Sequence, residues 1–89
     1  MIAAGDKIQI TSPYDGENLT VDSWHWITWE GYPDADVYIG ESKSTDQHKS
    51  NKHRQYITST MAGLTITVIA QNDSDNSDSN DGNFNIVDP

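Results

Sequence analysis

The chain has 89 residues, the size of one small domain, and it contains no cysteine. Neither disulfide bonds nor thiolate metal sites can stabilise it, so packing and sheet hydrogen bonds must do so. Fourteen acidic residues against five basic ones give a formal net charge of −9. Because such a surface repels phosphate groups, we expect no nucleic-acid partner and no anionic membrane partner.

The chain as a whole predicts one structural unit. We expect a single domain over residues 7–89, preceded by a short N-terminal arm over residues 1–6. No stretch has the length of an apolar transmembrane helix, so we expect no membrane insertion. The first residues have neither the basic start nor the apolar run of a signal peptide. Either a leader has been removed or the protein is assembled inside a cell.

Apolar residues recur at every second position along most of the chain, which is the pattern of β-strands. The predicted strands, in chain order, cover residues 7–11, 19–21, 24–29, 37–39, 55–60, 64–70 and 84–86. The segment 41–54 is polar throughout and predicts a long loop or a weak edge strand. The segment 71–83 is nearly all Asp, Asn and Ser, and predicts a solvated hairpin tip.

No segment shows the period of a helix, so the predicted class is all-β. About six or seven short antiparallel strands with regular turn signals indicate an immunoglobulin-like or fibronectin-III-like sandwich of two sheets. The inward positions of these strands predict the core residues, which are Ile8, Ile10, Ile27, Trp29, Val37, Ile39, Ile57, Leu64, Ile66, Val68, Phe84 and Ile86.

Several short motifs occur in an order typical of one family. The opening segment 8–17 reads IQITSPYDGE, and 27–29 reads ITW. The closing pieces are ITV at 66–68, SDS at 77–79 and FNI at 84–86. Together they resemble the KNH-like module of Ser/Thr-rich GPI-anchored surface proteins, apart from a shortened stretch between Tyr56 and Thr65. The resemblance implies an immunoglobulin-like sandwich used as a repeating surface module, without catalytic residues.

The strand 24–29 predicts an aromatic surface. Alternation places Ile27 and Trp29 on one face and Trp24 and Trp26 on the other. If Trp29 is in the core, the other two tryptophans lie on the outside of the sheet, with Tyr38 beside them. Exposed aromatic side chains stack on sugars or bind partner proteins, and the alternative is that the segment 41–54 covers them. The candidate binding surface is Trp24, Trp26, Tyr38, Lys49 and Lys52.

The acidic tip and the histidines are the possible metal ligands. Asp73, Asp75, Asp78 and Asp81 form a candidate calcium site, because calcium prefers clustered oxygen ligands. An EF-hand register fails, since its sixth position would be Asp78 rather than glycine, and the alternative is a solvated tip. His25, His48 and His53 have no ligand spacing that predicts zinc. We therefore expect no cofactor.

The sequence predicts a binding protein rather than an enzyme, because it has no nucleophile elbow and no Gly-rich phosphate loop. The first expectation is a structural module that binds copies of itself or a larger scaffold on a virion or cell surface. A decoration subunit of a virion and a component of a surface filament are examples. The alternative is a carbohydrate-binding or adhesion module of a secreted protein.

Overall fold

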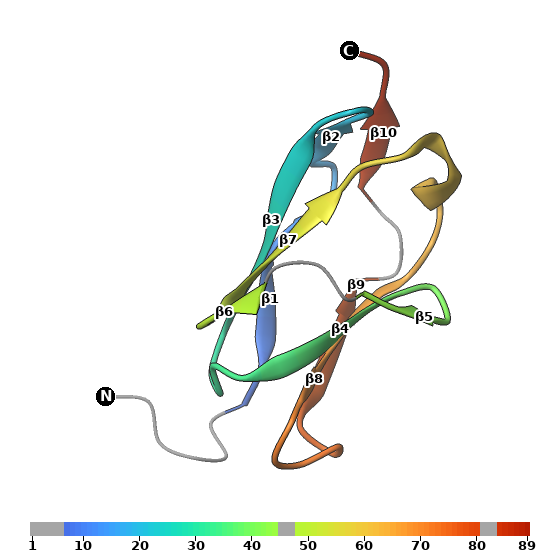
Figure 1. Ribbon diagram of the computed structural model, residues 1–89. Helices are drawn as coiled ribbons and strands as arrows, with labels where there is room; N and C mark the ends of the chain where they lie inside the picture. Colours follow the sequence, from blue (N-terminus) through green and yellow to red (C-terminus); the bar gives the residue numbers. More distant parts are fainter. Residues whose placement is uncertain (1–6, 45–47, 81–83) are drawn as a thin grey trace.

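The computed structural model describes residues 7–44, 48–80 and 84–89, with the side chains of 48 and 49 left out (Figure 1). These residues form an all-β domain, as predicted. In chain order its elements are β1 (Gln9–Ser12), β2 (Asn18–Thr20), β3 (Trp24–Glu30), β4 (Ala35–Ile39), β5 (Ser42–Lys43), β6 (His48–Lys49), β7 (Lys52–Tyr56), the 3-10 turn η1 (Ser59–Met61), β8 (Ile66–Ala70), β9 (Ser77–Asn80) and β10 (Asn85–Val87). Among the described residues, no helix has the length and apolar character needed to cross a membrane.

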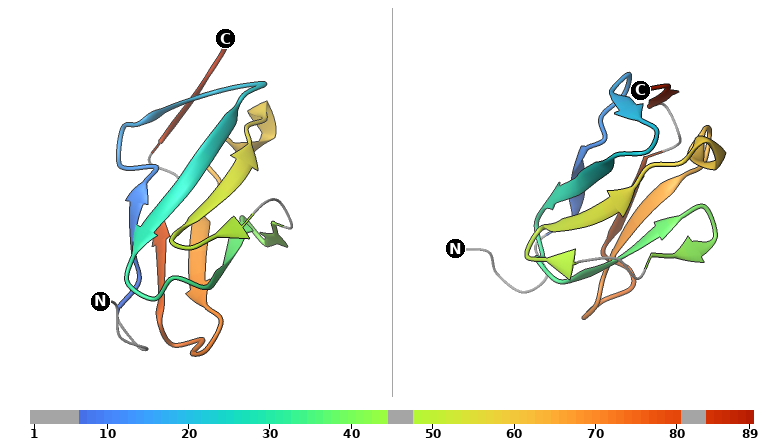
Figure 2. Two further views of the ribbon diagram at one scale, coloured as in Figure 1. Left: turned by 60° about the vertical axis from the view of Figure 1, so that its left-hand side comes forward. Right: turned by 45° about the horizontal axis from the view of Figure 1, so that its top comes forward.

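The strands form three small sheets (Figure 2). One four-stranded sheet has the order β1-β3-β7-β6, and the other has the order β5-β4-β8-β9. Neighbouring strands in both run antiparallel. Strands β2 and β10 make a two-stranded sheet that is parallel, whereas the sequence predicted antiparallel strands only. Figure 1 shows this pair at the end of the molecule where the chain terminates.

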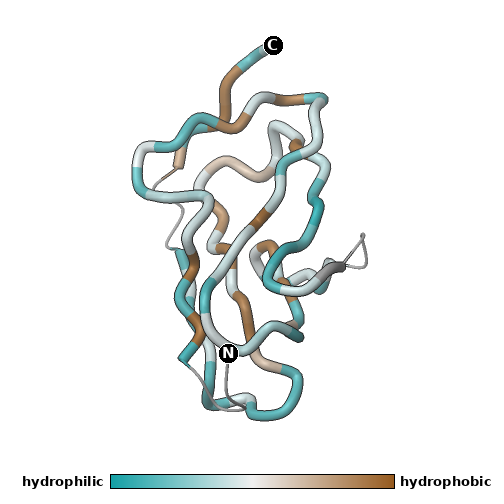
Figure 3. The backbone as a smooth tube through the Cα atoms, turned by 90° about the vertical axis from the view of Figure 1, so that its left-hand side faces the viewer, coloured by the Kyte–Doolittle hydropathy of each residue, from teal (hydrophilic) through white to brown (hydrophobic). Residues whose placement is uncertain are grey.

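The core is one cluster of buried apolar side chains drawn from both four-stranded sheets. Figure 3 shows the hydrophobic stretches along the strands, with hydrophilic residues gathered at the turns. The core prediction is confirmed for Ile8, Ile27, Trp29, Val37, Ile57, Ile66, Val68 and Phe84. Ile10, Ile39 and Ile86 are only partly buried, and the cluster also contains Leu19, Ala35, Met61 and Ala70.

The prediction for Leu64 was wrong. This side chain is 37% exposed, and β8 begins at Ile66 rather than at residue 64. The 3-10 turn η1 occupies Ser59–Met61 in place of the second half of the predicted strand 55–60. The turn carries Met61, which was not among the predicted core residues, into the core.

The two polar segments contain more strand than predicted: in 41–54, predicted as a long loop or a weak edge strand, β5 and β6 are edge strands. Strand β7 begins at Lys52 and lies between β3 and β6 inside its sheet, so 52–54 is not loop or edge strand. Strand β9 occupies Ser77–Asn80 and pairs with β8, so the predicted tip 71–83 is shorter than expected. Both strands consist mainly of polar residues, so apolar periodicity cannot reveal them.

A close approach of two backbone segments joins the first strand to the turn after β3. Gly31 has φ +94°, and an ideal Cβ built on it would lie 2.1 Å from the carbonyl oxygen of Lys7. Asn51 secures the same turn, because its Nδ2 donates to the carbonyl oxygens of Trp29 and Gly31, both at 3.1 Å. Position 31 therefore requires glycine, because a Cβ has no room there and because φ is positive.

Candidate functional site

The outward faces of β3 and β7 carry aromatic and cationic side chains in register. Strand pairing places Trp24 opposite Tyr56 and Trp26 opposite Arg54. Lys52 lies opposite Thr28, one step further along the same pair of strands. Side chains on one face of an antiparallel pair contact directly or diagonally. We call this set of five residues, Trp24, Trp26, Lys52, Arg54 and Tyr56, the cation–aromatic ladder.

Contacts between the members of the ladder are cation–π and edge-to-face. The Arg54 guanidinium carbon lies 4.3 Å from the centroid of the Trp24 ring, and Lys52 Nζ lies 4.8 Å from that of Trp26. The rings of Trp24 and Tyr56 meet edge to face, with centroids 5.2 Å apart. Such contacts orient the two cations on the sheet instead of leaving them free in solvent.

The exposure of the tryptophans confirms the predicted alternation. Trp29 is 3% exposed and lies in the core, whereas Trp24 is 49% exposed and Trp26 is partly buried. Trp24 is one of the few large apolar side chains of the described residues that remain open to solvent. The ladder therefore combines accessible aromatic area with fixed positive charge.

The two cations of the ladder have unused hydrogen-bonding capacity. Among the described side chains, the ion pairs are His25 with Glu17 and Lys43 with Asp36, and neither includes Lys52 or Arg54. Arg54 Nε is buried and has no hydrogen-bond partner within the described residues. The chain has fourteen acidic residues, yet no described carboxylate pairs with either of these oriented cations, which leaves them able to bind an acceptor from outside.

Asp22 closes one end of the ladder. The Tyr56 hydroxyl donates to Asp22 Oδ1 at 3.3 Å. Loss of solvation, together with this carboxylate, raises the pKa of the Tyr56 phenol above its ordinary value of 10.0. The phenol is therefore neutral across the physiological range and acts as a hydrogen-bond donor.

Two members of the predicted binding surface are not part of the ladder as described. Tyr38 lies on β4, in the other four-stranded sheet, opposite Lys43 and Thr67, so the prediction that it stands beside the tryptophans was wrong. The backbone of Lys49 pairs with that of Lys52, but its side chain lies outside the described part. Arg54 and Tyr56 were missed, and the alternation of 52, 54 and 56 would have indicated them once β7 was paired with β3.

A second feature is a seam between β1 and β9, the edge strands of the two larger sheets. Asn76 Oδ1 accepts from the backbone N–H of Ile8 at 2.8 Å, and Asp78 Oδ2 accepts from that of Ile10 at 2.8 Å. Asn80 Nδ2 donates to the carbonyl oxygen of Pro13 at 2.6 Å. Three side chains at alternate positions thus join two strands whose backbones do not form a ladder.

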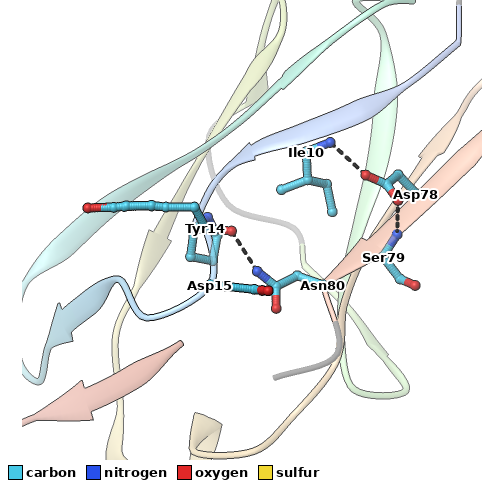
Figure 4. Close-up of a pocket in the computed structure, with 7 residues that line it drawn as sticks. Ile10, Tyr14, Asp15, Asp78, Ser79 and Asn80 are labelled. Carbon is cyan, nitrogen blue, oxygen red and sulfur yellow. Dashed lines mark hydrogen bonds between the residues drawn. The ribbon is translucent and has the colours of Figure 1, made fainter. Parts of the chain in front are cut away.

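The seam lines a polar hollow of about 360 Å³ (Figure 4). Its walls are Ile10, Pro13, Tyr14, Asp15, Asp78, Ser79 and Asn80. In Figure 4 the carboxylate of Asp78 lies between the backbone N–H groups of Ile10 and Ser79, and both of its oxygens accept hydrogen bonds. Asp78 therefore forms hydrogen bonds to backbone groups on both sides of the hollow. These bonds explain its position without a bound ligand.

The four aspartates of the candidate calcium site have different environments. Asp73 and Asp75 lie in the exposed turn between β8 and β9, whereas Asp78 is on the seam. Asp81 falls outside the described residues. Within the ranges that the structure describes, no group of three or more His, Cys, Asp or Glu residues could hold a metal ion.

The histidines also occupy separate positions. His53 is 3% exposed and lies in β7, where its Nε2 is 2.7 Å from Ser44 Oγ, so its assignment to a polar loop was wrong. His25 Nε2 lies 2.9 Å from Ser12 Oγ and 3.8 Å from Glu17 Oε2. The Ser12 hydroxyl in turn donates to Glu17 Oε1. Because Glu17 contacts the same ring nitrogen, it does not orient the imidazole through Nδ1 as in a catalytic triad.

His25 should make the stability of the fold depend on pH. Burial lowers its pKa from 6.5, and the neighbouring Glu17 opposes this shift. The unfolded chain therefore binds the proton more tightly, so stability is complete above about pH 6.5 and declines as the pH falls through the folded-state pKa. Urea unfolding between pH 7.5 and 5 should show a steeper decline for the native chain than for His25→Gln. Equal slopes for the two proteins would contradict this assignment.

Comparisons with protein-family models, with curated proteins and with solved structures found no match. They identify no family. The class of the chain therefore rests on its own structure, a small all-β domain with several short-stranded sheets.

Proposed function

We propose that this protein is a non-enzymatic assembly module that docks on other proteins through the cation–aromatic ladder. The observation that carries the proposal is the pairing of exposed Trp24 with Arg54, a fixed cation without a carboxylate among the described residues. Tryptophan and arginine are the residues most enriched at the energetic centres of protein interfaces. Tyr56 belongs to the same class and lies against Trp24.

The proposed architecture is an immunoglobulin-like or fibronectin-III-like sandwich of the KNH-like type. In support, one hydrophobic cluster draws side chains from both four-stranded sheets. The motifs at 8–17, 27–29 and 84–86 give the same architecture by resemblance. The setting that we propose is a decoration or filament subunit on the surface of a virion or cell.

Energetic considerations favour a mixed aromatic and ionic contact. An exposed ion pair contributes only about 0–1 kcal/mol. Truncation of a buried interfacial Trp or Arg often costs about 2 kcal/mol or more. A partner that covers the ladder would desolvate both groups together, which strengthens the cation–π contacts and any new hydrogen bond to Arg54.

The alternative function, binding of a carbohydrate, has one favourable observation. Trp24 presents an exposed ring of the kind that stacks on a sugar. However, a cation already lies against one face of each indole, at 4.3 Å for Trp24 and 4.8 Å for Trp26. A sugar would have to use the remaining edge or displace the cation. Docking on a protein is therefore the better supported proposal.

Site-specific photo-crosslinking tests the proposed face. A benzophenone amino acid is introduced at position 24, or at position 38 on the other sheet as the matched control, in the native host. We expect position 24 to give a discrete adduct with a protein that mass spectrometry identifies, and position 38 to give none. The purified partner should then bind the native chain at least about tenfold more tightly than Trp24→Ala/Trp26→Ala, which is about 1.4 kcal/mol.

A milder variant tests the same face in case Trp24→Ala/Trp26→Ala does not fold. Arg54→Gln keeps a long polar side chain but removes the charge and should weaken binding, whereas Tyr38→Ala should not. A folded double variant that binds the identified partner as well as the native chain would place the docking face elsewhere. Crosslinks only to glycans at position 24, with no protein adduct, would support the carbohydrate alternative.

A further inference from the structure

The turn between β8 and β9 presents negative charge at one end of the molecule. Residues 71–75 are all exposed, and Asp73 Oδ1 accepts from the backbone N–H of Asp75 at 3.0 Å. Neither carboxylate forms an ion pair with a cation of the described segments. The hydrogen bond within the turn holds the two aspartates close together on a short projection. We call residues 71–75 the acidic turn.

The chain therefore carries two surfaces of opposite charge, the ladder and the acidic turn, and the described residues of the two form no ion pair with each other. In the ladder, Lys52 and Arg54 have no carboxylate among the described residues, and in the acidic turn Asp73 and Asp75 have no cation. Figure 1 shows the turn between β8 and β9 at one end of the molecule, and the start of β3 and the end of β7 towards the other. Among the described residues of a single copy, no ion pair joins these two surfaces.

We propose that the partner of the cation–aromatic ladder is the acidic turn of a second copy of this chain. This inference rests on the proposed function and names its partner. Asp73 and Asp75 would accept hydrogen bonds from the guanidinium of Arg54 and the ammonium of Lys52, while Trp24 covers the contact. Carboxylates are the acceptors that a guanidinium and an ammonium bind most strongly.

Charge complementarity favours a second copy even though each copy carries a net charge of −9. Repulsion between whole copies acts over long distances and is screened beyond about 8 Å at physiological ionic strength. Contacts between the ladder and the turn act at hydrogen-bond distance, where screening is weaker. Association should therefore be stronger at 0.15 M salt than at about 0.01 M, where the Debye length is about 30 Å.

The geometry of this contact is heterologous, since one surface of a copy binds a different surface of the next. Such contacts continue into rings or open chains instead of stopping at a dimer. An open chain of copies would retain one free ladder at one end and one free turn at the other. This property makes the proposal testable with two variants that each lack one of the surfaces.

Sedimentation velocity tests the proposal with purified protein over a wide concentration range at 0.15 M salt. The native chain should form species larger than a dimer as the concentration rises. Lys52→Gln/Arg54→Gln removes the charges of the ladder, and Asp73→Asn/Asp75→Asn removes the charges of the turn, so each should be monomeric alone. An equimolar mixture of the two should form a dimer only, because one intact ladder meets one intact turn.

A charge-matched control separates the acidic turn from the effect of net charge. Glu41→Gln/Asp88→Asn changes the net charge by the same amount as the turn variant but leaves 71–75 intact, so it should associate like the native chain. All variants are compared by circular dichroism and thermal melting to establish that they are folded.

Three other outcomes would contradict the proposal, each for a different reason. A native chain that stays monomeric at every concentration excludes the second copy, while the crosslinking experiment still tests docking on another protein. A dimer that the turn variant also forms would show an isologous contact through the ladder. Association that the ladder variant retains would remove the ladder from the interface, and loss of the crosslink at position 24 would then count against the proposed function as well.

Discussion

Replacing Trp29 with alanine should lower the free energy of unfolding by about 3–5 kcal/mol, the range for a large core aromatic side chain. Trp29 is 3% exposed and belongs to the single hydrophobic cluster. Its Nε1 also donates to the carbonyl oxygen of Tyr32 at 3.0 Å, so the variant loses the partner of a buried group along with the packing. A domain of this size has little stability in reserve, so the variant should be largely unfolded at 37 °C.

Urea unfolding followed by circular dichroism measures this effect. The matched control is Trp24→Ala, which removes the same side chain from the same strand on the solvated face and should cost much less, on the order of 1 kcal/mol. A Trp29→Ala protein whose unfolding free energy lies within about 1 kcal/mol of the native value would contradict its place in the core.

Gly31→Ala should also be strongly destabilising, with a loss greater than about 2 kcal/mol from backbone strain and steric overlap together. The positive φ of +94° alone costs an L-residue about 1–2 kcal/mol. In addition, the new Cβ would meet the carbonyl oxygen of Lys7 at 2.1 Å and the backbone nitrogen of Ile8 at 2.9 Å. Because both are backbone atoms, the segment leading into β1 must move away from the turn.

Gly16→Ala is the matched control for this prediction. Gly16 has φ +84°, and nothing lies within 4 Å of the position of its Cβ, so this variant carries the conformational cost without the collision. Thermal melting and urea unfolding of the two variants separate these effects. Equal losses for Gly31→Ala and Gly16→Ala would mean that the first strand adjusts without cost.

The strands with strong apolar alternation could be predicted from the sequence. Strand β3 and the opposite faces of Trp24 and Trp29 follow from period two, because a buried face selects apolar residues at alternate positions. Strands β7 and β9 could not be recognised in this way. Their ladders are set by partner strands, and their sequences KHRQY and SDSN carry no apolar face of their own.

The candidate site could be predicted only in part for the same reason. Alternation within β3 was enough to place Trp24 and Trp26 on the solvated face. Their contacts with Arg54 and Lys52 depend on the register between β3 and β7, which the sequence of neither strand specifies alone. Tyr38 was misplaced because its face depends on which sheet β4 joins.

The seam between β1 and β9 has a consequence for the behaviour of the protein at high concentration. An edge strand with free backbone groups is a template onto which a foreign strand can add, and this is a route to aggregation. Along the free edge of β1 and the residue that precedes it, the N–H groups of Ile10 and Ile8, which an incoming strand would need, already donate to Asp78 and Asn76. The outer edge of β1 is thus blocked to strand addition, and in a crowded array of copies this edge would make contacts through side chains only.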